Sequence, residues 1–336
     1  MLNKEQMNVL HQLYTGLSDS QKQEFYDMLK DTKNTYSDKI HSESKDILLK
    51  EKHTEIICPF CGSKHIVKNG TVKKHQRFIC KDCKKTFGYT ENTIFKNTKI
   101  NADTIITYIR CFINKLSLKA CAEECNISIL TAFRWRHRIL DSLRNMQDRV
   151  KLNGIIESDE TYTAISYKGS RNIPRKAHKR GEPAGLRGLS REKACISCSV
   201  NHNGCSISGY SNLGKPKWTD IDNIIKDRIE EGSVFVTDSY KGYSKISYGM
   251  KLNHIRIARN KHSNGVFNIQ LINNYHKQFK TLINRIFNGV ATKYIDNYLV
   301  YHNFVNFSRG NRKHKIQSLL DFMLTNVFKM PKRVVV

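Results

Sequence analysis

Two Cys-x-x-Cys pairs constrain the amino-terminal part of this chain more than any other feature. Cys58 and Cys61 form the first pair, and Cys80 and Cys83 form the second. Each pair places two thiolates on a tight turn, and two such turns can close a tetrahedral metal site. The spacing therefore predicts a zinc ribbon over 54–95, in which a structural Zn²⁺ allows a segment too short for a hydrophobic core to fold by itself.

The charge balance favours a polyanionic partner. Lysine and arginine number 57 against 30 acidic residues, a formal net charge of +27. Such an excess repels itself unless a polyanion neutralises it, and double-stranded DNA is the partner that we expect. A membrane surface is the alternative, but no segment approaches the ~20 consecutive apolar residues of a spanning helix. Without an apolar signal segment, and with zinc-type cysteine spacing, we expect a cytoplasmic, nucleoid-associated protein.

The first 150 residues read as three parts. Apolar residues at helical spacing over 5–31 and a polar stretch after them indicate a helical amino terminus and linker, 1–53, before the ribbon. Over 96–150, three successive helices with a short middle turn, the third capped by Ser128, predict a helix-turn-helix. An ordinary three-helix bundle with a basic face is the alternative. The third helix carries three candidate DNA contacts, Arg134, Arg136 and Arg138.

After residue 150 the pattern changes from helical to strand-like. We predict strands at 154–163, 194–201, 204–210, 233–238 and 253–258, and helices at 219–231 and 269–287. This order suits a mixed sheet flanked by helices, as in the ribonuclease-H-like fold, over 151–308. The predicted fold class is therefore multidomain α+β: a small helical amino terminus, a zinc ribbon, a helix-turn-helix and a ribonuclease-H-like mixed α/β domain. A basic tail, 309–336, has no assigned purpose.

A basic segment, 167–193, interrupts the second half. It contains nine lysines and arginines against two glutamates, with no apolar periodicity. We interpret it as a loop that becomes ordered on a phosphate backbone, and a solvated insertion loop is the alternative. Its candidate DNA contacts are Arg175, Lys176, Lys179 and Arg180.

Two aspartates stand at strand positions of the second half. Asp159 lies within the first predicted strand, and Asp238 ends the apolar strand at 233–238. A carboxylate on a buried strand is costly unless it is paired or binds a metal. Two carboxylates on neighbouring strands can hold a pair of Mg²⁺ or Mn²⁺ ions for attack on phosphodiesters, although capping or ion pairing would also explain them.

The helix at 269–287 offers a third contribution. Asn273 and Lys280 are seven residues apart, about two turns, so both lie on one face with His276 between them. Asn273 can offer an amide oxygen to a metal, and Lys280 can neutralise a phosphate. Without further context, an exposed polar stripe on a surface helix is the preferred interpretation.

The order of these motifs resembles the DDE-type transposases of bacterial insertion sequences. The closest resemblance is to the branch with an amino-terminal zinc ribbon and Asp-Asp-Asn-Lys in place of Asp-Asp-Glu, and it covers about 54–305. Beyond the ribbon and helix-turn-helix, it is carried by the segments 157–162, 168–171, 236–243, 272–280 and 289–299.

This resemblance implies a metal-dependent enzyme that cleaves and joins DNA at the terminal inverted repeats of a mobile element, as a dimer or larger assembly. By implication Asp159 and Asp238 bind the catalytic ions, Asn273 takes the third catalytic position, and Lys280 is the lysine that follows it. Because a neutral amide binds Mg²⁺ more weakly than a carboxylate, Glu157 is a candidate for the missing charge. The alternative function is a DNA-binding regulator, including a transposase-derived protein that no longer cuts.

Overall fold

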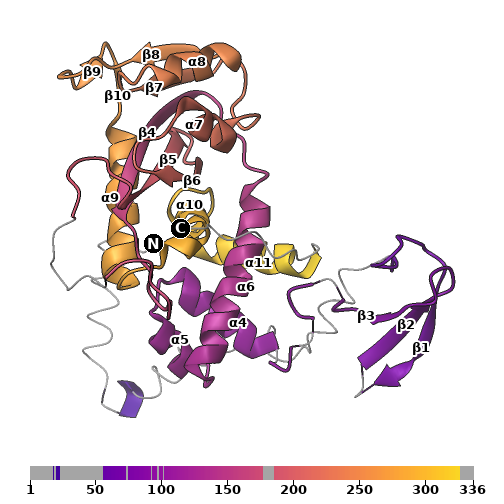
Figure 1. Cartoon of the computed structure of the whole chain (residues 1–336). Coiled ribbons are helices and arrows are strands. Elements are labelled where there is room, and N and C mark those ends of the chain that lie inside the picture. The colour runs from indigo at the N-terminus through magenta and orange to yellow at the C-terminus, as the bar shows by residue number, and fades with distance from the viewer. Residues whose placement is uncertain are drawn as a thin grey trace. The chain divides into compact units, whose positions relative to one another are not determined.

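The computed structural model describes residues 18, 20–22, 56–72, 75–91, 93–96, 98–100, 102–176 and 185–325. The chain divides into two compact units, one comprising 1–89 and 98–105 and the other 90–97 and 106–336. Most of the helical segment expected at 5–31, the linker after it, the centre of the basic loop and the last eleven residues lie outside the described residues. Figure 1 shows the elements of both units.

The first unit contains a three-stranded antiparallel sheet. It consists of β1 (Ile66–Val72), β2 (His75–Cys80) and β3 (Thr86–Gly88) in that order. Phe78 and Phe87 are buried beside Cys58 and Cys80, with their ring centroids 5.8 Å apart. The apolar core is therefore very small, as expected of a fold that a metal site completes.

Three helices precede the large sheet: α4 (Ala102–Ile113), α5 (Leu118–Glu124) and α6 (Ile129–Gln147). The predicted cap is confirmed, since the Ser128 Oγ accepts a hydrogen bond from the Thr131 amide at 3.1 Å. Residues 139–143 of α6 are buried, and the Asp141 Oδ1 accepts a hydrogen bond from the Asn297 side-chain amide at 2.7 Å. Most of this helical segment belongs to the same compact unit as the large sheet.

The second unit is built on a five-stranded mixed sheet. Its strands are β4 (Ile155–Ala164), β5 (Lys193–Asn201), β6 (Ser206–Leu213), β7 (Val234–Thr237) and β8 (Asn253–Arg256). Their spatial order is β6-β5-β4-β7-β8, with antiparallel pairing among the first three and parallel pairing from β4 to β7 to β8. The expected mixed α/β sheet is confirmed.

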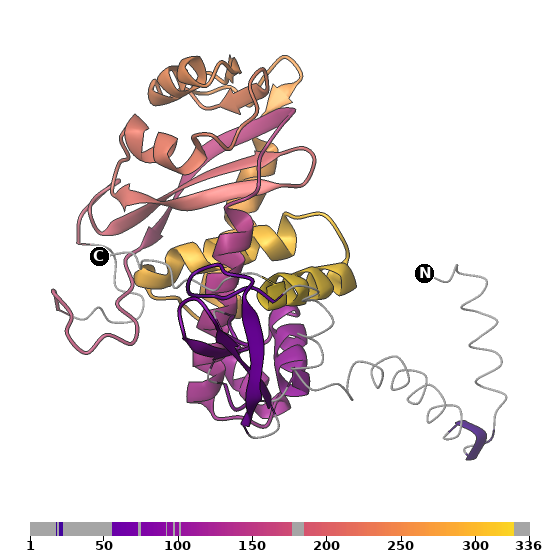
Figure 2. The same ribbon diagram turned by 90° about the vertical axis from the view of Figure 1, so that its right-hand side faces the viewer.

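Helices lie on both faces of this sheet (Figures 1 and 2). On one side, α7 (Trp218–Ile225) and α8 (Gly242–Gly249) bury Ile221, Ile225 and Ile246 in a core with Ile156 and Phe235. On the other, α9 (Gln270–Thr281) packs against β4 and β5, and α10 (Ile295–Asn306) packs against β6. Successive β4 side chains therefore face different helix layers.

The remaining elements are short or terminal. They are a β9–β10 hairpin (Ser263–Asn264 and Phe267–Asn268), the π-helix η1 (Leu282–Ile286), the 3₁₀-helix η2 (Thr292–Tyr294) and α11 (Arg312–Thr325). No helix among the described residues is both long and apolar enough to cross a bilayer.

Two helices in the second unit differ from their prediction, and one helix was not predicted. The helix expected at 219–231 ends at Ile225, because Lys226 leaves the helical conformation with ψ of 138°. The helix expected at 269–287 is α-helical only to Thr281 and continues as a π-helix. Helix α8 was not predicted at all, yet the parallel strands β7 and β8 require a crossover of this kind.

Candidate metal-binding active site

Strand pairing brings the two predicted aspartates together. In the parallel β4–β7 pair, Ser158 lies in register with Thr237. Asp159 follows Ser158 within β4, and Asp238 follows the last residue of β7, so the two aspartates occupy adjacent positions where the β4–β7 pairing ends. The pKa of Asp159 rises to about 6, mainly because the side chain is buried, and the negative charge of Asp238 adds to the rise. Such mutual repulsion marks a place where a cation would be stabilised.

One oxygen of each carboxylate is held by the backbone. The Glu160 amide donates a hydrogen bond to the Asp159 Oδ1 at 2.8 Å, and the Tyr240 amide donates to the Asp238 Oδ1 at 2.8 Å. These hydrogen bonds orient the two carboxylates, and the second oxygen of each carboxylate is not held by the backbone. Oxygen ligands in a negatively charged, half-buried setting fit a hard divalent cation such as Mg²⁺ or Mn²⁺.

Glu157 anchors α9 against β4. Its Oε2 accepts a hydrogen bond from the Ile272 amide, in the first turn of α9, at 2.9 Å. Its Oε1 lies 2.9 Å from the His202 Nε2, and the residue is only 1% exposed. With both oxygens engaged, Glu157 does not supply the missing metal charge that we considered for it. It instead neutralises the amide end of the helix that carries Asn273 and Lys280.

The side chains of α9 differ in burial and in how they interact with Asp159. His276 is 8% exposed, and its Nδ1 lies 4.0 Å from the Asp159 Oδ2. Burial lowers the pKa of His276 to about 4, so its imidazole is neutral at physiological pH. Asn273 and Lys280 are exposed on the same helix, and the positive charge of Lys280 lowers the pKa of Asp159 against the effect of burial.

Glu160 is a third acidic residue near Asp159 and Asp238, and the sequence did not identify it as part of the site. It faces the α8 side of β4, where the Tyr243 hydroxyl donates a hydrogen bond to its Oε1 at 2.6 Å. Burial, together with the negative charges of Asp159 and Asp238, raises the pKa of Glu160 to about 7. Three acidic residues within four positions of one buried strand were the available signal. The hydrogen bond of Glu160 to the fully buried Tyr243 is structural, and its carboxylate also interacts electrostatically with Asp159 and Asp238.

The predicted DNA contacts on α6 fall into different environments. Arg134 is exposed, whereas Arg136 is 4% exposed and its guanidinium lies over the rings of Phe112 and Phe287. Arg136 also donates a hydrogen bond to the Leu116 carbonyl at 3.0 Å. Arg136 is therefore buried and does not present the surface contact to DNA that we predicted for it. Its planar cation joins α6 to the elements around it instead.

The remaining predicted contacts are partly described. Arg138 is half-buried over the Trp135 ring, and Arg175 packs over Tyr167 at 5.5 Å from the ring centroid. Lys176 is exposed, and Lys179 and Arg180 lie outside the described residues.

The four ribbon cysteines converge as their spacing predicted. All four sulfurs lie within 4.8 Å of one another, with Cys58 and Cys83 at 3.5 Å and Cys61 and Cys80 at 3.6 Å. Tetrahedral thiolates at a Zn–S distance of about 2.3 Å stand nearly 4 Å apart. Hydrogen bonds from backbone amides lower the pKa of Cys80 to about 6, which favours the thiolate. The cluster fits a structural metal ion of the zinc type.

Family comparisons match both halves of the chain. Residues 54–84 match the InsA N-terminal domain, a zinc ribbon, and residues 151–304 match the ISXO2-like transposase domain. The second half of this chain is therefore similar to ISXO2-like transposase domains. Asp159, Asp238 and the whole of α9 fall within it.

A curated relative also belongs to a mobile element. It is an uncharacterised protein in transposable element ISH50 of Halobacterium salinarum, 30% identical over 139 residues. The match spans 40% of this chain and 43% of that protein, less than half of each.

Solved structures with distant similarity include two Mos1 complexes. The Mos1 mariner paired-end complex with Mn matches 64% of this chain and 74% of its own, at 8% identity and a TM-score of 0.26. The Mos1 strand transfer complex matches 65% and 74%, at 9% identity and a TM-score of 0.24. Both TM-scores are low, so the similarity to these structures is distant.

Proposed function

We propose that this chain is a DNA transposase that binds the terminal inverted repeats of an insertion sequence and cleaves and joins DNA strands with Mg²⁺ or Mn²⁺. The transposase domain family and the convergence of Asp159 and Asp238 support this proposal most strongly. The sheet order β6-β5-β4-β7-β8, with helices on both faces, is the arrangement expected of a ribonuclease-H-like catalytic domain.

Asp159 and Asp238 would hold the divalent ions through the oxygens that the backbone does not engage. Ions bound there supply an activated water or 3′-hydroxyl and stabilise the leaving oxygen. Lys280, exposed and close enough to lower the pKa of Asp159, neutralises charge on the scissile phosphate. Asn273 completes the ion's surroundings or orients the nucleophile, while neutral His276 supports Asp159 from α9.

Recognition of the DNA is assigned to the basic elements outside this site. The cysteine cluster holds Zn²⁺ and stabilises the ribbon as one DNA-contacting module, and α4–α6 form a helix-turn-helix with Arg134 on its exposed face. Arg175 and Lys176 belong to the basic loop that follows the DNA backbone. Because two element ends must be joined, the active form is at least a dimer.

The alternative is a DNA-binding regulator derived from a transposase. One observation favours it: the third catalytic position carries Asn273, a neutral ligand, where an all-carboxylate site would carry a charge. The two functions differ in whether the bound DNA is cut.

A cleavage assay with purified full-length protein separates them. The substrate is labelled DNA carrying the inverted repeats that flank the gene, with Mg²⁺ or Mn²⁺ supplied. We expect the native protein to cut at the element end, and Asp159→Ala and Asp238→Ala to bind the same DNA without cutting. The control is Glu231→Gln, which removes an exposed carboxylate that pairs with exposed Lys251. Binding without cleavage by the native protein would establish the regulator instead.

A further inference from the structure

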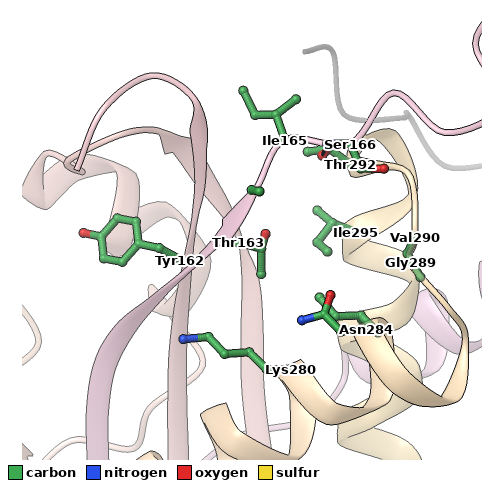
Figure 3. A pocket seen from close by; sticks show the side chains of 12 residues that line it. Tyr162, Thr163, Ile165, Ser166, Lys280, Asn284, Gly289, Val290, Thr292 and Ile295 are labelled. Carbon is green, nitrogen blue, oxygen red and sulfur yellow. Dashed lines mark hydrogen bonds between the residues drawn. The ribbon is translucent and has the colours of Figure 1, made fainter. Parts of the chain in front are cut away.

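A pocket of ≈ 390 Å³ opens where β4 ends, beside the predicted active site. Its wall is formed by Thr163 and Ser166 from the end of β4 and the residues after it, by Lys280 of α9, and by Ile283 and Asn284 of η1. Figure 3 shows the Lys280 side chain extending toward β4, with Asn284 on the same side of the helix. A volume of this size lies near the lower end of small-ligand sites, which span about 300–1,000 Å³.

The pocket wall has an unusual backbone. Ile283 and Asn284 lie in the π-helix Leu282–Ile286, which continues α9 without a break. Such π-helical turns are rare, and they occur frequently at functional sites because they displace side chains from regular helical positions. Asn284 is thereby presented to the pocket two residues before the helix ends.

The rim of the pocket is held in place by hydrogen bonds. The Ser166 amide donates to the Thr292 Oγ1 at 2.8 Å, and the Thr292 amide donates to the Ser166 carbonyl at 2.9 Å. Lys168 donates to the carbonyls of Asn288 and Gly289 at 2.8 and 2.9 Å. The pocket is therefore preformed, and it lies at the point where the basic loop leaves the sheet.

Lys280 connects this pocket to the aspartates. It lines the pocket, and its charge also acts on Asp159. Along β4, Thr163 is four residues beyond Asp159, or roughly 13 Å at the rise of a strand. A pocket at this distance is within reach of a nucleotide close to a scissile phosphate bound at Asp159.

The lining suits a nucleobase. Ile283, Val290 and Ile295 offer apolar surface for a ring, while the Asn284 amide carries both a donor and an acceptor, as base-edge recognition requires. Lys280 at the mouth suits the attached phosphate. We propose that this pocket receives the base of one nucleotide that leaves the duplex next to the scissile phosphate. This inference rests on the proposed transposase function.

The test first blocks the pocket with a bulky side chain and then uses DNA that lacks the base proposed to enter it. Cleavage rates are measured for the native protein, Asn284→Trp and Thr281→Trp on the normal end and on ends with one abasic nucleotide at successive positions near the cut. Asn284 and Thr281 are both exposed polar residues of one continuous helix, but only Asn284 lines the pocket, so Thr281→Trp is the matched control. Asn284→Trp should cut the normal end roughly 10-fold more slowly, within the range of one lost base contact, while Thr281→Trp cuts at the native rate.

The abasic substrates decide the inference. At one position, removal of the base should bring Asn284→Trp to the native rate on the same DNA, because nothing remains to enter the filled pocket. An Asn284→Trp protein that cuts the normal end at the native rate, or that stays slow on every abasic substrate, would overturn the inference while native cleavage upholds the transposase. If the native protein does not cut the normal end, both the pocket inference and the proposed transposase function are rejected.

Discussion

The Nδ1 of His276 lies 4.0 Å from the Oδ2 of Asp159, so helix α9 meets the first aspartate through a residue between the two predicted catalytic positions. His276 is almost fully buried, and its Nε2 makes no hydrogen bond within the part of the chain that the structure describes. At 4.0 Å the neutral imidazole is beyond hydrogen-bonding distance of the carboxylate, so we propose that it limits the movement of Asp159 by packing, without competing for a cation. We therefore assign His276 a positioning role.

Replacement of His276 should separate cleavage from binding. We expect His276→Ala to cut an element end about 10-fold more slowly with unchanged DNA affinity, because only the alignment of Asp159 is lost. His276→Gln, which keeps a polar group near the carboxylate, should recover part of the rate. His262→Ala, at an exposed histidine, is the control. Equal losses of affinity and rate in His276→Ala would argue for a general packing role.

The raised pKa of Asp159 predicts an unusual pH dependence of stability without metal. Its folded-state pKa of about 6 exceeds the ordinary value of 3.8, so ionisation destabilises the fold as pH rises from about 4 to 6, and the full cost remains above that range. Asp159→Asn should therefore raise the free energy of unfolding by about 1–3 kcal/mol at pH 7.5. The advantage should disappear below pH 4.

Thermal unfolding in a chelator of divalent cations measures this effect. Mg²⁺ or Mn²⁺ should stabilise the native protein and leave Asp159→Asn nearly unchanged, because only the native site gains a cation. A lower melting temperature for Asp159→Asn at pH 7.5 without metal would contradict the electrostatic account of the site.

Loss of a ribbon cysteine should affect one unit of the protein only. Cys58→Ser should lose bound zinc and recognition of the element end together, since the ribbon has a very small apolar core of its own. The sheet unit, with a separate and larger core, should unfold at its native temperature. Zinc content by mass spectrometry and DNA affinity are the measurements, and Cys205→Ser, outside the cluster, is the control. Full end binding by Cys58→Ser would move the DNA-reading function away from the ribbon.

Two arginines two residues apart on α6 should behave in opposite ways. Arg136→Met should cost about 1–3 kcal/mol of stability, because it loses the ring contacts and leaves the Leu116 carbonyl without its donor. Arg134→Ala should leave stability unchanged but weaken DNA binding, with the slope of log K against log[salt] falling by about 1. Chemical denaturation and salt-dependent binding distinguish the two. A reversed pattern would mean that α6 is not the DNA-facing helix.

The sequence predicted the features that depend on residues close to one another in the chain. The zinc ribbon was predictable from the spacing of its two Cys-x-x-Cys pairs. The β5–β6 hairpin is consistent with the Asn203–Gly204 pair at its turn, where Gly204 adopts a φ of 82°. Asp159 and Asp238 were identifiable because carboxylates on apolar strands are costly.

The features that it did not predict depend on contacts between distant residues. The role of Glu157 is set by Ile272, more than a hundred residues away, and that of Arg136 by Phe287. Arg136 was expected on the surface because charge alone indicates exposure. Helix α8 was missed because eight residues bounded by glycines carry too few apolar positions for a helical period.

The central claim is that Asp159 and Asp238 share a divalent cation site. Titration of Mn²⁺ into the full-length protein bound to an element end, with zinc already in the ribbon, tests it most directly. The account predicts saturable Mn²⁺ binding by the native complex that both Asp159→Asn and Asp238→Asn abolish, with the Glu231→Gln control binding as the native protein does. Unchanged Mn²⁺ affinity in either aspartate variant would contradict it.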